Sequence, residues 1–488
     1  MELFPARDIP ARDVLASVVV FLVALPLCIG VAVASGVPPE LGLVTGIVGG
    51  LVAGALPGSS LQVSGPAAGL TVLVYEAVRE HGLPVLGLIV LATGLLQLAM
   101  GALRLGRWFR AISVSVVQGM LAGIGLALVF GQAHTLFDGR SPGAALANIT
   151  ALPALVADSA RDTSALAAGG VGVGTLLVLV CWRFVPAWLR TVPAALVAVA
   201  LATLATALFD LPVKRIQVHG LLESIRPPAL DQLGRLADVG VLGTIIAFTL
   251  IASAESLFSA AAVDRMHDGP RTRYDQELMA QGAGNTVCGM LGALPMTAVI
   301  VRSATNVQAG ARTKLSRVLH GGWLLLFTVA APAALGVIPV TALAAVLVHA
   351  GWKLLSPREV GRLWRTERGE AIVLIGTTLA IVFTNLFEGV LIGILLAVSK
   401  TAWDVSDIHV DVREHDEGPI EIKLTGNATF LRLPRVLDTL EAIPHGRPVE
   451  LDLSGLRHLD HACRTALLSW AAQHRRRDDT PVRVSEPV

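Results

Sequence analysis

Two charged residues lie in stretches of the chain that are otherwise almost entirely apolar. Glu255 stands in residues 249–259 (TLIASAESLFS) and Arg302 in residues 294–303 (LPMTAVIVRS). An ionisable side chain inside a membrane segment costs roughly 2.5–3.5 kcal/mol on insertion scales, so it marks a functional candidate. A fixed guanidinium attracts an anion, and an intramembrane carboxylate carries a proton or helps to bind a cation. The pair therefore predicts an anion site with a coupling group.

Both residues also have a structural explanation. Glu255 could tie helices together, and Arg302 could form a salt bridge, with Glu255 as the plausible partner. Such pairing would offset the cost of leaving either charge alone, and it is compatible with a part-time functional role. Ser259 lies one turn after Glu255 on the same helical face, so it joins Glu255 as a candidate coupling residue.

Two short segments interrupted by Gly and Pro provide the second signal. Residues 62–71 contain Pro66 and residues 294–303 contain Pro295, 229 positions later. Broken helices at matching places in two halves indicate the midplane binding site of a transporter. A helix that starts inside the bilayer exposes N–H groups that lipid cannot satisfy, and two such helix ends facing each other would attract an anion.

These segments supply the candidate substrate-binding residues. They are Ser64, Gly65, Pro66, Ala67, Thr297, Ala298, Val299, Arg302 and Ser303. Gly and Ala let backbone N–H groups approach a ligand closely, and Pro at a helix start needs no N–H. We expect the N–H groups of Ala67, Ala298 and Val299 to bind the anion.

Other polar residues of the apolar segments are weaker candidates. Gln62, Thr71, Gln118, Asn285 and Asn306 could line the cavity, but ordinary hydrogen bonding between helices explains them better. The sequence has no Cys/His metal spacing, phosphate-cradling loop or nucleophile elbow. An enzyme, a cofactor and a resident metal are therefore not expected.

Composition places these candidates in a membrane protein. Of 488 residues, 53% are hydrophobic and only 15% are charged, against about 25% charged in soluble proteins. The net charge is +1 and the basic residues are scattered over short loops, so nucleic acid is not suggested as a partner.

Hydropathy divides the chain into fourteen membrane segments, two of them half-spans. They cover roughly residues 13–35, 39–57, 65–78, 84–103, 112–133, 166–184, 191–209, 238–263, 274–293, 297–310, 316–336, 339–352, 369–384 and 387–403. Lys and Arg concentrate in the loops on the side of the N-terminus, which predicts cytoplasmic N- and C-termini. Seven segments followed by seven predict an inverted repeat.

The chain changes character at about Asp404. Residues 420–424 and 449–453 alternate like strands, and residues 431–442 and 462–474 have helical spacing. The sequence therefore predicts a transmembrane domain over residues 1–403 and a small cytosolic α/β domain over residues 404–488.

Four motifs resemble those of a known family. Residues 34–43 (ASGVPPELGL) resemble the Ala-Gly-x-Pro-Pro-x-x-Gly-Leu-Tyr signature of the sulfate permease (SulP) anion transporters. Residues 57–66 (PGSSLQVSGP) are similar to the Gly-Ser-Ser/Arg stretch before that family's Gly-Pro, and residues 304–313 (ATNVQAGART) to its Thr-x-Asn-x-x-Ala-Gly-Ala run. Residues 451–460 (LDLSGLRHLD) resemble the STAS domain that these transporters carry.

The resemblance implies an architecture. It implies a homodimer whose core domain (spans 1–4 and 8–11) moves like an elevator against a gate domain (spans 5–7 and 12–14). Residues 460–463 (DHAC) resemble a bacterial subgroup, some members of which are fused to carbonic anhydrase, which raises bicarbonate as a substrate.

The sequence departs from the family's sodium-driven bicarbonate members at two places. Those members hold Na⁺ with an Asp and a Thr where this chain has Glu255 and Ser259, and they have a small residue where it has Arg302. A guanidinium there would compete with the cation, so the departures favour proton coupling or exchange. Sodium at Glu255 and Ser259 stays open.

The sequence thus predicts a secondary active transporter of a small anion, such as bicarbonate, sulfate or a carboxylate, in a bacterial inner membrane. The coupling ion, H⁺ or Na⁺, and the choice of anion remain open. One alternative is a nucleobase-type permease of the same architecture. Another is a non-transporting scaffold or voltage-responsive protein whose STAS domain recruits partners.

Overall fold

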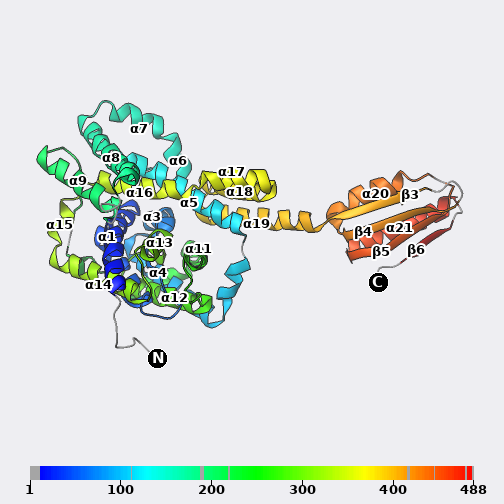
Figure 1. The fold of residues 1–488 in the computed structure, drawn as a ribbon, viewed down its shortest axis with the longest axis horizontal. Coiled ribbons are helices and arrows are strands. Elements are labelled where there is room, and N and C mark those ends of the chain that lie inside the picture. The colour runs from blue at the N-terminus through cyan, green and yellow to red at the C-terminus, as the bar shows by residue number, and fades with distance from the viewer. Residues whose placement is uncertain are drawn as a thin grey trace. The chain divides into compact units, whose positions relative to one another are not determined.

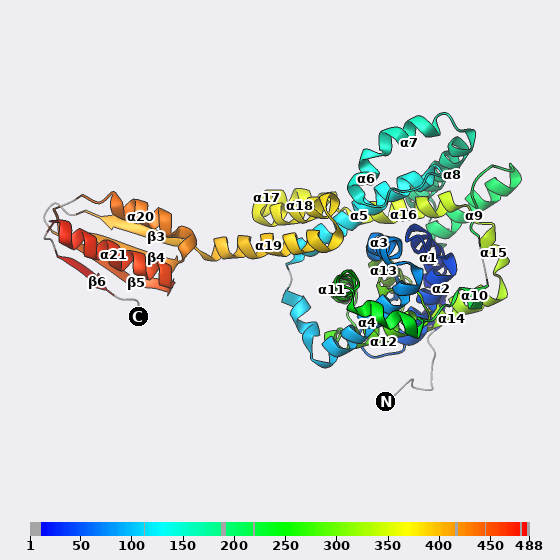
Figure 2. The same ribbon diagram turned by 180° about the vertical axis from the view of Figure 1, so that it is seen from behind.

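A computed structural model describes residues 11–111, 113–186, 192–217, 220–414, 418–444, 446–478 and 481–485. The chain forms two compact units, Met1–Ile394 and Leu395–Val488 (Figures 1 and 2). The predicted span starts at 112 and 191, and the outer limits of the predicted domains at 1 and 488, lie outside the described residues.

The first half of the first unit consists of helices and one short strand. These are α1 (Ala11–Ala34), α2 (Pro39–Val48) with its π-helical extension η1 (Gly49–Ala53), β1 (Ser64–Pro66), the short 3₁₀ helix η2 (Ala68–Leu70), α3 (Thr71–His81), α4 (Leu83–Ala102), η3 (Leu105–Ala111), α5 (Val114–Leu136), α6 (Ala145–Thr150), α7 (Leu152–Ser159), α8 (Thr163–Cys181), η4 (Trp182–Phe184) and α9 (Ala194–Leu208). Short helices α10 (Leu221–Ser224) and η6 (Leu230–Ala237) connect it to the second half.

The second half repeats this pattern. It contains α11 (Val239–Asp264), α12 (Tyr274–Met290), β2 (Met296–Ala298), α13 (Ile300–Gln308), α14 (Leu315–Ala330), α15 (Ala333–Gly336), α16 (Val340–Leu354), α17 (Pro357–Thr366), α18 (Arg368–Phe383) and α19 (Leu386–Val405). By length and composition, seven of the described helices could cross a membrane, and three shorter apolar helices accompany them.

Each predicted segment coincides with a helix of the structure. In order they are α1, α2 with η1, η2 with α3, α4, α5, α8, α9, α11, α12, α13, α14, α16, α18 and α19. The short helices α6, α7 and α17 were not predicted, because they are too short or too polar to give a hydropathy signal.

The two half-spans differ from the prediction at their starts. We expected helices from 65 and 297, but the chain is extended as β1 and β2 before η2 begins at Ala68 and α13 at Ile300. The strands pair antiparallel, with Ser64 opposite Ala298 and Pro66 opposite Met296. Segments from opposite halves of the chain therefore meet backbone to backbone.

Glycines bring α12 and α4 into close contact. A Cβ on Gly94 would lie 2.3 Å from the backbone nitrogen of Thr286, and one on Gly289 would lie 2.2 Å from that of Leu91. Small residues let helix backbones approach in this way in membranes, where packing supplies much of the association energy. Helix α12 is thereby held rigidly against α4, and it also contacts β2.

The second unit is a small α/β domain. Its sheet has the order β3-β4-β5-β6, from strands β3 (Ile408–Arg413), β4 (Ile420–Ala428), β5 (Val449–Leu459) and β6 (Val482–Ser485). Strand β3 is antiparallel to β4, and the other neighbours are parallel. The helices are η7 (Phe430–Arg432), α20 (Leu433–Glu441) and α21 (His461–Asp478), so the predicted strands and helices are confirmed.

Asp460 fixes the start of α21. Its carboxylate accepts hydrogen bonds from the backbone N–H groups of Cys463 at 2.7 Å and Phe430 at 2.6 Å. Burial by itself raises the pKa of Asp460, but these N–H groups hold that pKa below its ordinary value. The residue that the resemblance singled out thus has a structural role as a helix cap.

Candidate functional site

The crossing of β1 and β2 brings two helix starts together. Beyond the strand pair, the N–H of Val299 donates to the carbonyl of Val63 at 2.9 Å, and α13 begins at the next residue. On the other side η2 begins at Ala68 and runs into α3. Figures 1 and 2 show α3 and α13 near each other in the middle of the first unit. The first N–H groups of a helix lack intrahelical partners, so this crossing concentrates positive potential.

Arg302 lies at the crossing, buried and with unpaired nitrogens. It is 1% exposed, and Nε and Nη1 have no hydrogen-bond partner among the residues that the structure describes. The guanidinium packs on the backbone of Gly65, where an added Cβ would lie 2.1 Å from Nη1, and it also borders the thiol of Cys28. A buried cation that lacks partners is costly, and an anion would supply them.

Glu255 faces the same region from α11. Its carboxylate packs on Gly69, where an added Cβ would lie 2.9 Å from both oxygens, and Thr297 faces it from β2. Within the described part of the chain, no ion pair joins Glu255 to Arg302, and Oε2 of Glu255 has no hydrogen-bond partner. The salt bridge that we considered as a structural explanation is therefore absent from this conformation.

A cavity of about 50 Å³ joins these groups. Its lining residues are Leu27, Val31, Pro66, Gly69, Leu121, Ile124, Glu255, Ser259, Val299, Ile300, Val301, Arg302, Ala350 and Leu354. Since one buried water needs about 10–15 Å³ on this measure, the space holds roughly three or four water-sized groups. A small, mostly apolar cavity with one guanidinium and one carboxylate suits a small anion.

The structure divides the predicted site residues into two groups. Pro66, Val299, Arg302, Glu255 and Ser259 line the cavity. The others, Ser64, Gly65, Ala67, Thr297, Ala298 and Ser303, are buried at the strand crossing beside it.

Two of the expected anion-binding amides are already occupied. The N–H of Ala298 donates to Ser256 Oγ at 3.2 Å, and that of Val299 donates to Val63. The chain is still extended here, so these amides bond to a side chain of α11 and to the segment before β1 instead of starting the helix. The first N–H groups of α13, from Ile300 onward, have no partner within the helix.

Hydroxyls near the crossing also bond within the protein. Ser259 donates to the carbonyl of Ala298 at 3.0 Å, so the candidate coupling residue braces β2. The Ser303 hydroxyl accepts from the N–H of Val63 at 2.9 Å and donates to the carbonyl of Val299 at 2.8 Å. These contacts hold the two broken segments together.

Two of the weaker polar candidates, Gln62 and Asn306, form hydrogen bonds to backbone carbonyls of other segments. Gln62 Nε2 donates to the carbonyl of Ser256 at 2.8 Å, and Asn306 Nδ2 donates to that of Leu61 at 2.9 Å.

The sequence analysis missed Arg317, which is 2% exposed and donates to the carbonyl of Leu56 at 2.7 Å. Arg317 lies at the start of α14, next to loop residues, so its sequence context is that of an ordinary arginine in a cytoplasmic loop.

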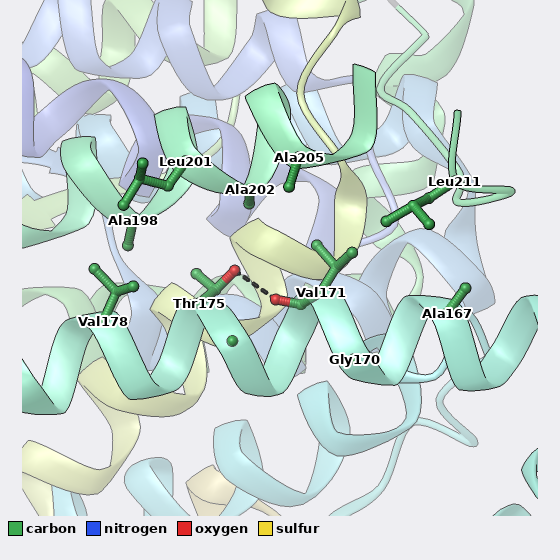
Figure 3. Close-up of a pocket in the computed structure, with 11 residues that line it drawn as sticks. Ala167, Gly170, Val171, Thr175, Val178, Ala198, Leu201, Ala202, Ala205 and Leu211 are labelled. Carbon is green, nitrogen blue, oxygen red and sulfur yellow. Dashed lines mark hydrogen bonds between the residues drawn. The ribbon is translucent and has the colours of Figure 1, made fainter. Parts of the chain in front are cut away.

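A larger groove of the first unit, between α8 and α9, lacks the features of an anion site. This groove of about 480 Å³ is lined almost wholly by small and aliphatic residues (Figure 3). Its hydroxyl, on Thr175, donates at 2.7 Å to the carbonyl of Val171 in the same helix. No charged residue among the described ones lines this groove, so it has no group that would attract an anion.

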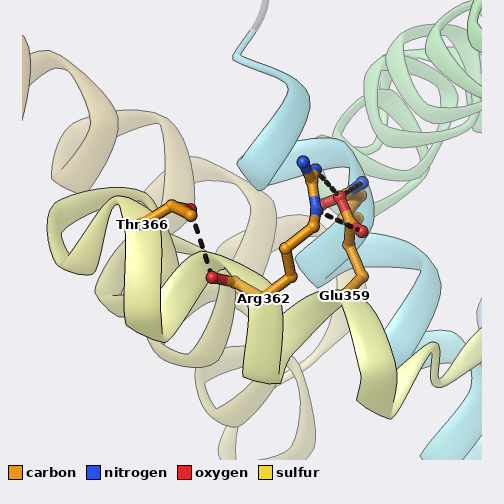
Figure 4. A network of polar contacts seen from close by, with 4 residues as sticks. Glu359, Arg362 and Thr366 are labelled. Carbon is orange, nitrogen blue, oxygen red and sulfur yellow. Dashed lines mark hydrogen bonds and ion pairs between the residues drawn. The ribbon is translucent and has the colours of Figure 1, made fainter.

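A charged network on α17 lies outside the cavity. Arg362 Nε donates to Glu359 Oε2 at 3.0 Å, and the Thr366 hydroxyl donates to the carbonyl of Arg362 at 3.1 Å (Figure 4). Gln118 of α5 donates to Glu359 at 3.5 Å, which links α17 to α5. Solvent screens such an exposed pair, so it contributes little to stability, and its two charges already neutralise each other.

Several known proteins that are similar to this chain are named as anion transporters. The curated relatives include a putative sulfate transporter, YvdB of Bacillus subtilis, 27% identical over 79% of this chain and 72% of its own. They also include the bicarbonate transporter BicA of Picosynechococcus, 25% identical over 85% of this chain and 74% of its own. The solved transmembrane domain of a cyanobacterial BicA superposes with a TM-score of 0.68 at 24% identity, covering 78% of this chain and 97% of that one.

Family models settle the assignment. The model "Mlab, STAS domain" matches residues 411–485, where the small sheet lies. The predicted fold class is confirmed: an α-helical membrane protein with a C-terminal STAS domain. The model of the sulfate permease family matches residues 11–377, so the chain belongs to that family.

Proposed function

We propose that this protein is a secondary active transporter that carries a small anion across the bacterial inner membrane, with both termini in the cytoplasm. The observation that carries the proposal is the buried guanidinium of Arg302, whose Nε and Nη1 have no partner among the described residues, at the meeting point of two helix starts. Helix N-termini and a guanidinium both stabilise negative charge without needing to be protonated. Relatives named as sulfate and bicarbonate transporters support the substrate class.

The bound anion would accept hydrogen bonds from Arg302 and from the first N–H groups of α13. The helix start at Ala68 would add its positive potential from the opposite side. Bicarbonate, sulfate and small carboxylates all present oxygens to such donors. We therefore propose small oxyanions as the substrates.

The cavity's walls suggest how the anion is released. Pro66, Glu255 and Arg302 come from the spans of the proposed core, whereas Ile124 on α5 and Leu354 on α16 come from those of the proposed gate. Helices α5, α8, α16 and α18 pack on one another, as do α1, α2 and α14. Sliding of the core against the gate in a homodimer would expose the cavity to each side in turn, as an elevator mechanism requires.

Glu255 is the proposed coupling group. Its carboxylate faces the anion cavity and has an oxygen without a protein partner, so a proton or a cation could accompany the anion there. Arg302 in the same cavity repels a cation, which favours a proton or an exchanged anion over Na⁺. The STAS domain, whose Asp460 is used as a helix cap, would serve in assembly or regulation.

Uptake by reconstituted protein tests the proposal. Proteoliposomes would be given radiolabelled bicarbonate or sulfate, each with an imposed pH gradient, a Na⁺ gradient or neither. We expect saturable uptake of at least one anion, faster with an acidic exterior than with external Na⁺. Absence of saturable uptake for every oxyanion and gradient would refute the proposal, and specific uracil uptake would replace it with the nucleobase permease.

Gly65→Ala should weaken anion binding although it adds only a methyl group. The new Cβ would occupy the place of Arg302 Nη1 and push the guanidinium out of the cavity. Because ångström-scale misplacement of a site group can cost up to about 100-fold, we expect KM for uptake to rise about tenfold or more. Gly174→Ala is the matched control, since its Cβ meets nothing within 4 Å. Equal KM values for the two variants would show that Arg302 need not occupy its observed position.

A further inference from the structure

Helix α12 carries three buried polar residues on one face. Glu277, Gln281 and Asn285 are spaced four residues apart, so they lie above one another along the helix. Their side chains are 1%, 0% and 0% exposed. None of the three lines the anion cavity. Buried polar side chains need hydrogen-bond partners, and the partners of these three residues indicate their role.

The side chain of Asn285 binds the backbone of β2. Its Oδ1 accepts from the N–H of Met296 at 2.7 Å, and its Nδ2 donates to the carbonyl of the same residue at 3.0 Å. One carboxamide thus satisfies both backbone groups of Met296, as a neighbouring strand would. Nδ2 also donates to Gln97 Oε1 on α4 at 2.8 Å, and Gln97 donates to Ser253 of α11 at 3.1 Å.

Gln281 and Glu277 hold β1 in the corresponding way. Gln281 Nε2 donates to the hydroxyl of Ser64 at 2.7 Å and to Glu277 Oε1 at 2.7 Å. Glu277 Oε2 accepts from the N–H of Ser59, in the loop before β1, at 2.7 Å. One helix therefore grips both strands of the crossing, one strand from each half of the chain.

The strands need this support because each is only three residues long. An isolated two-stranded pair is marginally stable at best. The register of the strand pair sets where Gly65 and Gly69 lie. The guanidinium of Arg302 packs against Gly65, and the carboxylate of Glu255 packs against Gly69. Any shift of either strand therefore moves the two charged groups of the site.

We propose that Gln281 and Asn285 are positioning residues for the anion site: from behind the strand crossing they fix β1 and β2, and with them Arg302, at the separation that binds the anion. The inference rests on the proposed function. It adds that anion affinity is set by side chains that never touch the anion.

Asn285→Leu and Gln281→Leu test this with KM as the main readout. Each change removes a strand contact while keeping a buried side chain of similar size. Loss of a buried hydrogen-bonded pair costs enough to expect KM for bicarbonate or sulfate uptake to rise about tenfold. Because the lost interaction acts on binding, Vmax per inserted protein should stay within about threefold. Thr286→Val is the control, since that hydroxyl donates only to Gly282 of its own helix, at 2.8 Å.

A double change provides the rescue. Glu277→Gln combined with Gln281→Glu keeps one carboxylate and one carboxamide on adjacent turns, so the side chain at 281 can accept from Ser64 and that at 277 can accept from Ser59. We expect its KM to return close to that of the unmodified protein. If the leucine variants fail to insert, Asn285→Asp, which keeps the acceptor for Met296 N–H but loses both donors, should give the same rise in KM.

Two outcomes overturn the inference. One is a KM for Asn285→Leu or, where that fails to insert, Asn285→Asp that equals the KM of Thr286→Val. The other is a rescue variant with the same KM as Gln281→Leu. Failure of the unmodified protein to take up any anion is a separate result, which refutes the proposed function and this inference with it.

Discussion

Arg302→Ala is expected to abolish saturable anion uptake while the protein still inserts in the membrane. The substitution removes the guanidinium whose Nε and Nη1 lack protein partners, and no other Lys or Arg among the described residues lines the cavity. Truncating a buried charged partner costs about 2–5 kcal/mol in binding, so affinity should fall on the order of 100-fold or more. Initial rates in proteoliposomes across a range of bicarbonate or sulfate concentrations measure the loss.

Two further variants show whether uptake is lost because the positive charge is missing or because the fold is disturbed. Arg302→Lys keeps a positive charge but not the planar fork, so we expect partial activity with a higher KM. Arg183→Ala removes an arginine of η4 whose guanidinium lies over the ring of Phe184 and which is not among the cavity-lining residues, so it should leave uptake unchanged. Saturable uptake by Arg302→Ala at the unmodified KM would remove Arg302 from the site.

The position of the site could be predicted from the sequence, because it depends on residues with few alternative uses. A charged residue within an apolar segment is expensive, and a Gly-Pro pair inside a span breaks the helix. Glu255, Arg302 and the Pro66 segment carried these signals, and the structure brings all three to one cavity. Hydropathy located the spans for the same reason: lipid exposure demands long apolar runs.

The local backbone at the crossing could not be predicted. Three-residue strands are too short to show an alternating pattern, and both are completely buried, so each resembles the start of an apolar helix. The amide of Val299 bonds to Val63, just before the partner strand, and that of Ala298 bonds to the Ser256 hydroxyl of α11. Both acceptors are distant in sequence, so only the folded structure reveals them.

The supporting face of α12 illustrates a different limit. Its four-residue spacing is visible in the sequence, but polar residues in a span usually serve helix contacts, which was the interpretation given to Asn285. What distinguishes Asn285 is its partner, the backbone of Met296, eleven residues later across a turn. Side chains that bind backbone leave no complementary residue in the sequence to point to them.

Glu255→Gln should remove the pH dependence of uptake. If a proton enters with each anion, uptake by the unmodified protein rises as the external pH falls, because the carboxylate must be protonated before the loaded core moves. One proton changes the loaded fraction by up to about tenfold per pH unit in the range where Glu255 is mostly ionised. The amide cannot ionise, so the variant should keep one rate from acid to alkaline pH and should no longer concentrate the anion against its gradient.

The control for this variant is a carboxylate outside the cavity. Glu359→Gln removes the acceptor of the α17 network and should leave the pH profile intact, because Glu359 pairs with Arg362 and does not line the site. Initial rates between pH 6 and pH 8, with the imposed gradient reversed in a second series, separate proton coupling from a pH effect on the anion itself. An unchanged profile in Glu255→Gln would assign coupling elsewhere. Uptake by the unmodified protein that follows external Na⁺ and ignores pH would restore the sodium alternative, in which Glu255 and Ser259 hold that ion.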